Sequence, residues 1–357
     1  MIDYTELVGM RQAPALNVPA VRVSGEPLTP SSLASWQHRA WKKRHWPPVP
    51  ITVFEIEDAL VLCEGLVFRP DGSVVSATAE FTSPAELASA SAAFDQNLEQ
   101  ARLIEEPALL AMRPGGNCYG HVITEVMGSA WAAASLLGER PFSLLTEAST
   151  PAILEVYTEA ARCAGLLARP IINEREHGPV RVKKLYVAEG FALTDRYLSP
   201  LLADFARKVV ESCGGWGPAT RKLYVPRQGD QGRVASNEAE VWRELQARGF
   251  ELVRPQTLKW VDQVRLFAQA SHIVGPMGSG LANALFSPPG ARLLTLAPAC
   301  MGDSFFWRVS GIVGVDYEEI RCATVDSPGY QRTKRPQDRD IVVDLKSLLH
   351  WADTQER

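Results

Sequence analysis

At 357 residues the chain exceeds the usual size of a single hydrophobic core, which favours two domains over one. Apolar residues make up 46% of the sequence and charged residues 22%, a composition typical of packed globular proteins and not of disordered ones. The 37 Lys and Arg against 41 Asp and Glu give a formal charge of −4, so no basic excess points to nucleic acid as a partner.

The six cysteines form no Cys-x-x-Cys pair and show no regular spacing, which indicates buried free thiols and neither a zinc site nor a disulfide framework. The N-terminal residues lack the basic stretch and apolar run of a signal peptide, and no segment approaches the roughly 18 apolar residues of a membrane-spanning helix. We therefore expect a cytoplasmic enzyme.

The first fifty residues are rich in proline and predict an irregular arm. The arm ends in Trp41–Pro48, whose basic-aromatic patch is typical of solvated surface and alternatively suits contact with a membrane or an acidic acceptor. From Ile51 to Val75 the pattern is strand-like, with Asp71-Gly72 as a hairpin turn. The arm therefore leads into antiparallel strands.

Further along, the first domain mixes helices with strands. The Ala- and Leu-rich segment 136–168, broken at Gly138 and Pro141, predicts helices packed on a sheet. A short strand is expected at 184–187. A long amphipathic helix then leads to the Gly- and Pro-rich stretch 211–218, where we place the domain boundary.

Beyond the boundary, strands alternate with single helices. Strands are expected at 222–225, 250–253, 272–274 and 292–296, and helices at 238–248, at 261–270 and from Gly278 onward. This alternation implies right-handed crossovers and a parallel, doubly wound sheet, which binds ligands at the carboxyl ends of its strands. The chain divides into an arm (1–50), two α/β domains (51–218 and 219–330) and a tail (331–357).

The tail contains Ile341–Trp351, whose apolar spacing is helical. We expect this helix either to pack back on the first domain or to form the contact of a homodimer.

The sharpest local signal is Gly278-Ser279-Gly280, which stands between a β-branched strand and an apolar helix. Uncrowded amides at a helix start suit a phosphate group. No lysine follows as in a Walker A motif, and Asn283 occupies the third glycine position of a dinucleotide fingerprint, so hydride transfer with NAD is disfavoured. A tight strand-to-helix turn without a ligand is the alternative.

Upstream of this loop, Arg227 follows a strand end, and Arg233 and Asn237-Glu238 come just before the next helix. The two arginines are candidates to bind a diphosphate, and Glu238 is a candidate to accept hydrogen bonds from a ribose or sugar hydroxyl. The alternative is structural: Asn237 caps the helix, Glu238 favours its dipole, and the arginines are loop charges.

In the first domain, His121 and Glu125 are four residues apart on an apolar helix and share one face. A carboxylate beside an imidazole raises its basicity and holds its tautomer, which suits a general base. The pair has no obvious third ligand, so we expect no metal site. We expect the neighbouring Asn117 and Tyr119 to line the part of the site that binds the hydroxyl from which this base takes a proton.

Together these segments resemble glycosyltransferase family 61. The family pattern runs Asn-x-x-x-His-x-x-x-Glu, Tyr-x-x-Arg, Arg-x-x-x-Asn-Glu, Gly-Phe-Glu, Gln-Val and Gly-x-His-Gly-Ala-Gly-Leu-x-Asn. The corresponding text here lies at Asn117–Glu125, Tyr224–Arg227, Arg233–Glu238, Gly249–Glu251, Gln263–Val264 and Gly275–Asn283. Order and spacing both match.

The resemblance implies a GT-B fold, with two Rossmann-like domains facing a cleft, and inverting transfer without an obligatory metal or other cofactor. It implies a nucleotide sugar as co-substrate, with a UDP-sugar favoured, and a glycan, glycolipid or small-molecule acceptor. The donor side then comprises Arg227, Arg233, Asn237, Glu238, Gly278, Ser279, Gly280 and Asn283, and the catalytic pair is His121 with Glu125.

One departure concerns the glycine block, where Met277 replaces the family's histidine and Ser279 its alanine. Methionine cannot donate a hydrogen bond to phosphate. A changed donor or a lost activity is therefore an open alternative, as are a non-catalytic module of the same fold and a nucleotide-sugar epimerase.

Overall fold

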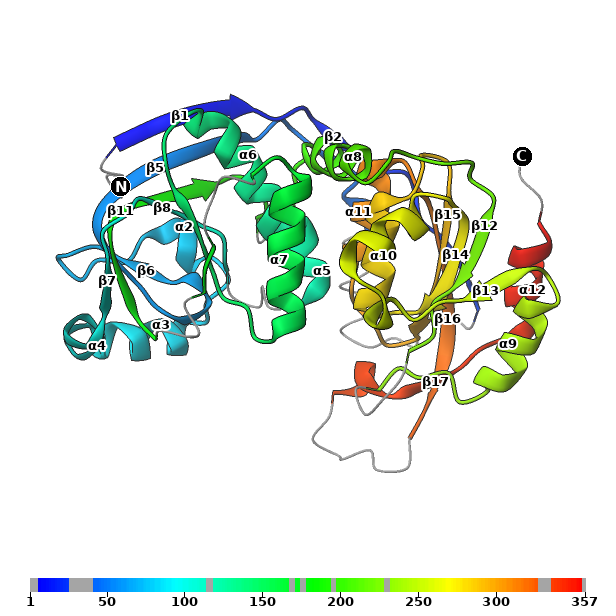
Figure 1. Ribbon diagram of the computed structural model, residues 1–357. Helices are drawn as coiled ribbons and strands as arrows, with labels where there is room; N and C mark the ends of the chain where they lie inside the picture. Colours follow the sequence, from blue (N-terminus) through cyan, green and yellow to red (C-terminus); the bar gives the residue numbers. More distant parts are fainter. Residues whose placement is uncertain are drawn as a thin grey trace. The chain divides into compact units, whose positions relative to one another are not determined.

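The computed structural model describes residues 6–25, 41–113, 118–166, 171–173, 178–193, 197–227, 232–326 and 335–354. The chain forms two compact units (Figure 1). The first comprises Met1–Ala15 and Pro47–Ser212, and the second comprises Leu16–Trp46 and Cys213–Arg357. The sequence placed the boundary at residue 218, six residues beyond the end of the first unit. The expected separate arm is instead divided between the two units, because its short strands pair with both.

The first unit is built on a mixed sheet. Its strands are β1 (Glu6–Gln12), β5 (Pro50–Val61), β11 (Val180–Glu189), β8 (Ala108–Leu110), β9 (Ser143–Thr146) and β10 (Ile171–Asn173), in that order across the sheet, with β6 (Val67–Phe68) beside β5 and β7 (Arg102–Ile104) beside β11. The pairs β1–β5, β5–β11 and β5–β6 are antiparallel. The pairs β11–β8, β8–β9, β9–β10 and β11–β7 are parallel. The mixed sheet agrees with the α/β class expected from the sequence.

The hairpin turn expected at Asp71-Gly72 is confirmed. Phe68 bridges Val74 across the turn, and Gly72 has a φ of 80°, a left-handed value that favours glycine. The helical expectation for 136–168 is wrong over Ser143–Thr146, which is strand β9. All four of its residues are buried, so the run lacks the alternation that marks a half-exposed strand.

The helices of the first unit are α2 (Ser76–Ala79), α3 (Pro84–Ala92), α4 (Phe94–Gln100), α5 (Tyr119–His121), α6 (Met127–Leu137), α7 (Pro151–Cys163) and α8 (Leu202–Ser212), with a 3-10 turn at Cys63–Gly65. A π-helical turn, Val122–Val126, joins α5 to α6. Helix α6 packs on β1, β5 and β11, and α3 and α4 cover an apolar cluster around Leu60 and Phe68. The π-helical turn is therefore part of a helix held firmly against the sheet.

The second unit has a largely parallel sheet. Its strands are β13 (Phe250–Leu252), β12 (Arg221–Tyr224), β14 (Ala270–Pro276), β15 (Arg292–Pro298), β16 (Asp316–Val325) and β17 (Asp340–Val342), in that order, with β3 (Arg22–Gly25) parallel to β16. Strands β13 to β16 are parallel, as the alternating pattern predicted. The chain proceeds in one direction from β12 to β13 and in the other from β14 onward, so a topological switch point lies between β12 and β14.

Helices cover both faces of this sheet. Helices α9 (Glu238–Gln246) and α12 (Leu345–Asp353) lie on one side, and α10 (Trp260–Phe267), the 3-10 helix η5 (Ser279–Phe286) and α11 (Phe305–Val313) lie on the other (Figure 1). Short 3-10 turns stand at Pro255–Thr257 and Pro336–Asp338, and β2 (Leu16–Asn17) pairs with β4 (His45–Trp46). The helix expected to open at Gly278 is thus a 3-10 helix.

The tail differs from the expectation in two ways. Ile341 and Val342 belong to strand β17, antiparallel to β16, and the helix begins only at Leu345. Helix α12 packs within the second unit, where the Trp351 ring lies 6.2 Å from that of Phe250 and 5.7 Å from that of His272. The apolar face of the tail therefore completes the core around β12 and β13.

The cysteines agree only partly with the expectation of buried thiols. Among the described side chains, Cys163, Cys213 and Cys322 are free and buried, but Cys118 is exposed and Cys300 is half-buried.

Candidate functional site

The switch point brings Arg227 and the glycine loop together. Val225, just past β12, donates its N–H to the carbonyl of Val274 in β14 at 2.8 Å. The two backbones approach so closely that a Cβ at Gly275 would overlap the Val225 carbonyl, and a Cβ at Gly278 would overlap Nη1 of Arg227. Space therefore requires glycine at position 275, where the clash is with backbone, whereas at position 278 the Arg227 guanidinium occupies the room that a side chain would take.

The guanidinium of Arg227 is fixed by backbone carbonyls. Its Nε donates to Gly232 at 2.6 Å and its Nη1 donates to Met277 at 3.5 Å. The residue is half-buried at the carboxyl edge of the sheet, where a doubly wound fold binds its ligands. A guanidinium held in this way can bind an anion without a large loss of side-chain entropy.

Two residues of the glycine block, Met277 and Asn283, are buried. Met277 is 1% exposed, and its N–H donates to the Leu296 carbonyl at 2.9 Å. Asn283 is fully buried, and its Nδ2 donates to Oε1 of Gln263 at 3.1 Å and to the Gly280 carbonyl at 3.2 Å. Asn283 therefore fastens the glycine loop to α10, and Ser279, which is half-buried, is the side chain that remains nearer the surface.

Arg233 and Asn237 contact the C-terminal segment. Arg233, with a left-handed φ of 63°, pairs with Asp338 at 3.6 Å. The Asn237 amide makes two hydrogen bonds to the backbone of Val343, both 3.0 Å long, and does not cap α9. The spacing of these residues in the sequence predicted a place on the donor side, whereas their observed contacts are with the C-terminal segment.

Glu238 lies at the carboxyl edge together with Arg254. Glu238 begins α9, the helix that connects β12 to β13, and Arg254 lies two residues after the end of β13. Burial raises the pKa of the Glu238 carboxyl, and the charge of Arg254 opposes that rise. We did not single out Arg254 from the sequence, although its position just past a strand of a parallel sheet was a usable signal.

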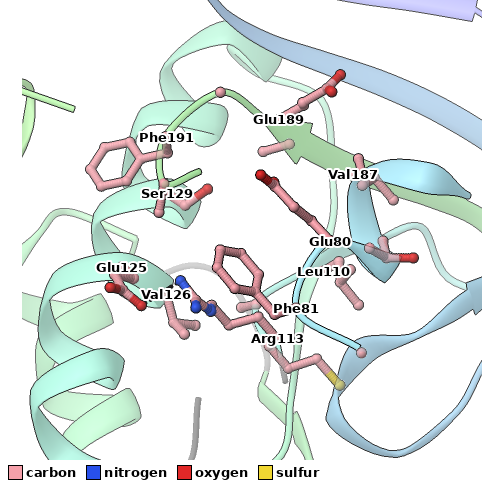
Figure 2. A pocket seen from close by; sticks show the side chains of 18 residues that line it. Glu80, Phe81, Leu110, Arg113, Glu125, Val126, Ser129, Val187, Glu189 and Phe191 are labelled. Atoms are coloured by element: carbon pink, nitrogen blue, oxygen red, sulfur yellow. Dashed lines mark ion pairs between the residues drawn. The ribbon is translucent and has the colours of Figure 1, made fainter. Parts of the chain in front are cut away.

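In the first unit, His121 and Glu125 meet as their spacing predicted. Nδ1 of His121 lies 2.9 Å from Oε2 of Glu125. The same carboxylate oxygen forms an ion pair with Nη1 of Arg113, which follows β8. Figure 2 shows Arg113 between Glu125 and Phe81, whose ring centroid lies 3.7 Å from the guanidinium carbon. The carboxylate is therefore shared between an imidazole and a guanidinium.

The Arg113–Glu125 pair lines a cavity of about 80 Å³ that also contains Glu80, Ser129 and Glu189 (Figure 2). Typical small-molecule pockets are roughly 300–1,000 Å³, so this cavity admits part of a ligand only. Spacing did not identify Arg113 or these lining residues, because they come from separate elements. Asn117 lies outside the described residues, and Tyr119 begins α5 half-buried.

Within the described part of the chain, no group of three or more His, Cys, Asp or Glu is arranged to hold a metal ion. In the same residues, no helix is long and apolar enough to cross a bilayer.

A model of the family described as Glycosyltransferase 61 matches residues 119–294. The matched range includes His121 and Glu125 in the first unit and Arg227, Gly278 and Asn283 in the second. No curated protein matches the chain.

Proposed function

The chain belongs to the glycosyltransferase 61 family, and from this premise we propose that it transfers a sugar from a nucleotide-sugar donor, a UDP-sugar being favoured, to an acceptor hydroxyl with inversion. The acceptor is a glycan, a glycolipid or a small molecule. In this proposal the second unit is the donor-side domain and the first unit the acceptor-side domain of a GT-B enzyme.

The observation that carries the proposal is the position of Arg227 over Gly278 at the switch point. Breaking the bond between the anomeric carbon and the diphosphate leaves negative charge on the departing phosphate oxygens. A prepositioned guanidinium and the amides at the start of η5 stabilise that charge as it develops. This needs no metal ion, because the fixed cation supplies the positive charge.

His121 is the general base in this scheme, and Glu125 orients it. The Glu125 side chain is only 10% exposed and its Oε2 already binds Arg113, whereas the His121 side chain is 38% exposed. With Nδ1–H donated to Glu125, the imidazole accepts the proton of the acceptor hydroxyl at Nε2. The acceptor oxygen then bonds to the anomeric carbon from the face opposite the leaving group, and the nucleoside diphosphate departs with the bonding electrons.

The contact of Glu125 with Arg113 supports separate roles for His121, as the base, and Glu125, as the orienting group. Oε2 of Glu125 already pairs with Nη1 of Arg113 and with Nδ1 of His121, so this oxygen is engaged by two neighbouring groups. Glu125 therefore stabilises the imidazolium as it forms and does not compete with His121 as the base.

The alternative of a non-catalytic module drew on Met277 at the position of the family's histidine. The Met277 side chain is buried and Ser279 is half-buried, so Ser279 and the backbone amides of the loop are the groups that we assign to the donor. The substitution therefore gives little support to a lost donor site. An epimerase, in contrast, would convert its sugar nucleotide without any acceptor.

A thermal-shift panel of UDP, GDP, CMP and dTDP, each with and without magnesium, tests the proposal. A ligand at 100 times its dissociation constant stabilises the folded protein by about 2.7 kcal/mol, which is readily measured. We expect one nucleotide to stabilise the wild type without magnesium and to fail with Arg227→Ala. Stabilisation by none of the four would count against a nucleotide-sugar donor, and epimer release without an acceptor would favour the epimerase.

A further inference from the structure

Four segments of the first unit form the walls of the cavity beside Arg113 (Figure 2). The walls are closely packed. A Cβ at Gly128 of α6 would lie 2.6 Å from Cζ of Phe191, which follows β11, and a Cβ at Gly65 would lie 2.8 Å from Cγ of Met112, which follows β8. Neither contact leaves room for an added methyl group, so close packing sets the shape of the cavity.

The cavity shares Glu125 with the proposed base. Glu125 lines the cavity, and its Oε2 lies 2.9 Å from Nδ1 of His121. Ser129, which is four residues further along the same helix, also lines it. Four helical residues rise roughly 6 Å, so the cavity lies about one to two turns from His121. An acceptor sugar with its reacting hydroxyl at His121 therefore extends far enough to place another of its groups in the cavity.

Glu80 and Ser129 face each other across the cavity. Figure 2 shows both side chains directed into it, whereas the side chain of Glu189 extends away from it. The backbone that carries Glu80 is held by Thr78, whose Oγ1 makes hydrogen bonds of 3.0 and 2.8 Å with the neighbouring backbone. Two polar groups therefore stand on opposite walls, one on a fixed turn and one on a helix.

The charged side chains that line the cavity are mostly acidic. They are Glu80, Glu125, Glu189 and Arg113, three carboxylates and one guanidinium with a formal sum of −2. The guanidinium is already in contact with Glu125 and with the ring of Phe81. A phosphate or carboxylate of a ligand would meet like charge here. A hydroxyl, in contrast, donates a hydrogen bond to a carboxylate and exchanges hydrogen bonds with a serine.

We propose that the cavity binds the hydroxymethyl group of an acceptor sugar, with Glu80 and Ser129 as the residues that select it, so that neutral sugars are preferred over sugars that carry an acid or a phosphate there. This rests on the proposed role of His121 as the base. The hydroxymethyl group of a hexose projects beyond the ring. A cavity of about 80 Å³ accommodates such an arm and is too small for a whole sugar residue.

The test measures the affinity of the full chain for pairs of sugars by NMR titration, with and without UDP. Each pair consists of the methyl glycoside of glucose, galactose or mannose and its uronide, in which a carboxylate replaces the hydroxymethyl group. We expect the wild type to bind at least one neutral glycoside and to bind the matching uronide at least about tenfold more weakly. In Glu80→Gln this ratio should fall to about threefold or less, because the repelling charge is removed. Ser129→Ala should weaken binding of the neutral glycoside by about threefold to tenfold.

Glu99→Gln is the matched control, because Glu99 is an exposed carboxylate on α4 that does not line the cavity. It should keep the wild-type ratio, and a melting curve of each variant checks that it is folded. Equal or tighter binding of the uronides, an unchanged ratio in a folded Glu80→Gln variant, or no binding of any neutral glycoside overturns the assignment. Tighter binding of a 6-amino-6-deoxy glycoside would assign the cavity to an ammonium group and overturn it as well.

The outcome for the cavity is separate from the outcome for the donor site. If the sugar assignment fails while a nucleotide still stabilises the protein through Arg227, the proposed transferase stands without this acceptor subsite. If a neutral glycoside binds in a way that depends on Glu80 and no nucleotide stabilises the protein, the cavity is retained as a sugar site and the proposed transfer falls.

Discussion

Nη1 of Arg227 occupies the space that a Cβ would need at Gly278. The two residues are 51 positions apart in sequence and meet only because β12 and β14 are neighbours in the sheet. The guanidinium can therefore occupy this position because residue 278 has no side chain.

Gly278→Ala is expected to displace the Arg227 guanidinium and weaken donor binding. The residue at 278 has an extended backbone that alanine adopts without strain, and the group that must move is the end of a flexible side chain. The melting temperature should therefore change little, while KM for the donor rises by about tenfold, the value of one charge-assisted hydrogen bond. Steady-state kinetics over a range of donor concentrations measures this.

Gly217→Ala is the control for that substitution. Its new Cβ would also press on a flexible side chain, that of Gln269, but it lies before β12 at the other edge of the sheet. Donor KM should stay at the wild-type value in this variant. An unchanged donor KM in Gly278→Ala would show that the position of Arg227 does not matter for the donor.

His121→Ala is expected to lower kcat by roughly 10²- to 10⁴-fold, the usual contribution of a positioned general base. Donor nucleotide binding should be unchanged, because the residue belongs to the other unit and contacts the acceptor hydroxyl in the proposed mechanism. His350→Ala, an exposed histidine on α12, is the matched control. Loss of nucleotide binding together with kcat would contradict the role of base.

Glu125→Gln tests the orienting role separately. The amide keeps the size of the side chain but removes the charge that stabilises an imidazolium, so kcat should fall while the acceptor KM changes little. The variant also leaves Arg113 without its ion-pair partner, so a melting curve must accompany the kinetics. Full activity in a folded Glu125→Gln variant would remove Glu125 from the mechanism.

The strands and helices of the second unit were predictable because a short stretch of sequence indicates each of them. Each strand from β12 to β15 is a β-rich run bounded by a helix, and parallel pairing follows from the connections. The same reasoning missed β9, because its four consecutive buried residues resemble part of a buried helix. It also missed β3, which pairs with β16, a strand nearly 300 residues further along the chain. Pairing between distant segments leaves no periodic trace in either one.

The contacts of the candidate site residues were also only partly predictable from the sequence. The four-residue spacing of His121 and Glu125 fixes their contact on a helix, so it was predictable. The spacing of Arg233 and Asn237 matched a motif, but spacing carries no information about side-chain direction, and both contact the tail. Arg113 reaches Glu125 from a different strand end, and only the fold brings them together.

Arg321 and Glu319 form a buried ion pair on β16, in which Tyr317 donates to the same carboxylate. Burial raises the pKa of the Glu319 carboxyl, and the charge of Arg321 opposes that rise. Arg321→Met is expected to destabilise the fold by about 3–5 kcal/mol at pH 7, since it leaves a charged carboxylate buried without a partner. Urea unfolding measures the change.

The sign of the pH dependence follows from the direction of that pKa shift. A carboxyl whose pKa is raised in the folded state favours folding while protonated, and this contribution is lost as pH rises from its ordinary value of 4.5 through the folded value. The cost of Arg321→Met should therefore shrink as pH is lowered from 7 to 5. The double variant Glu319→Gln with Arg321→Met, which removes both charges, should recover much of the free energy of unfolding at pH 7. An equal cost at both pH values would mean that the carboxylate is not the cause.

Asn237 separates a donor-binding role from a structural one. Its amide makes both hydrogen bonds to the Val343 backbone, between β17 and α12. Asn237→Ala leaves those backbone groups without partners and should lower the free energy of unfolding by about 1–3 kcal/mol. At a temperature where the variant is folded, nucleotide affinity should match that of the wild type, because the substituted side chain faces the tail. Ser236→Ala, which removes a single hydrogen bond to Ile341 from an exposed residue, should cost less. A variant that keeps wild-type stability but loses nucleotide affinity would return Asn237 to the donor site.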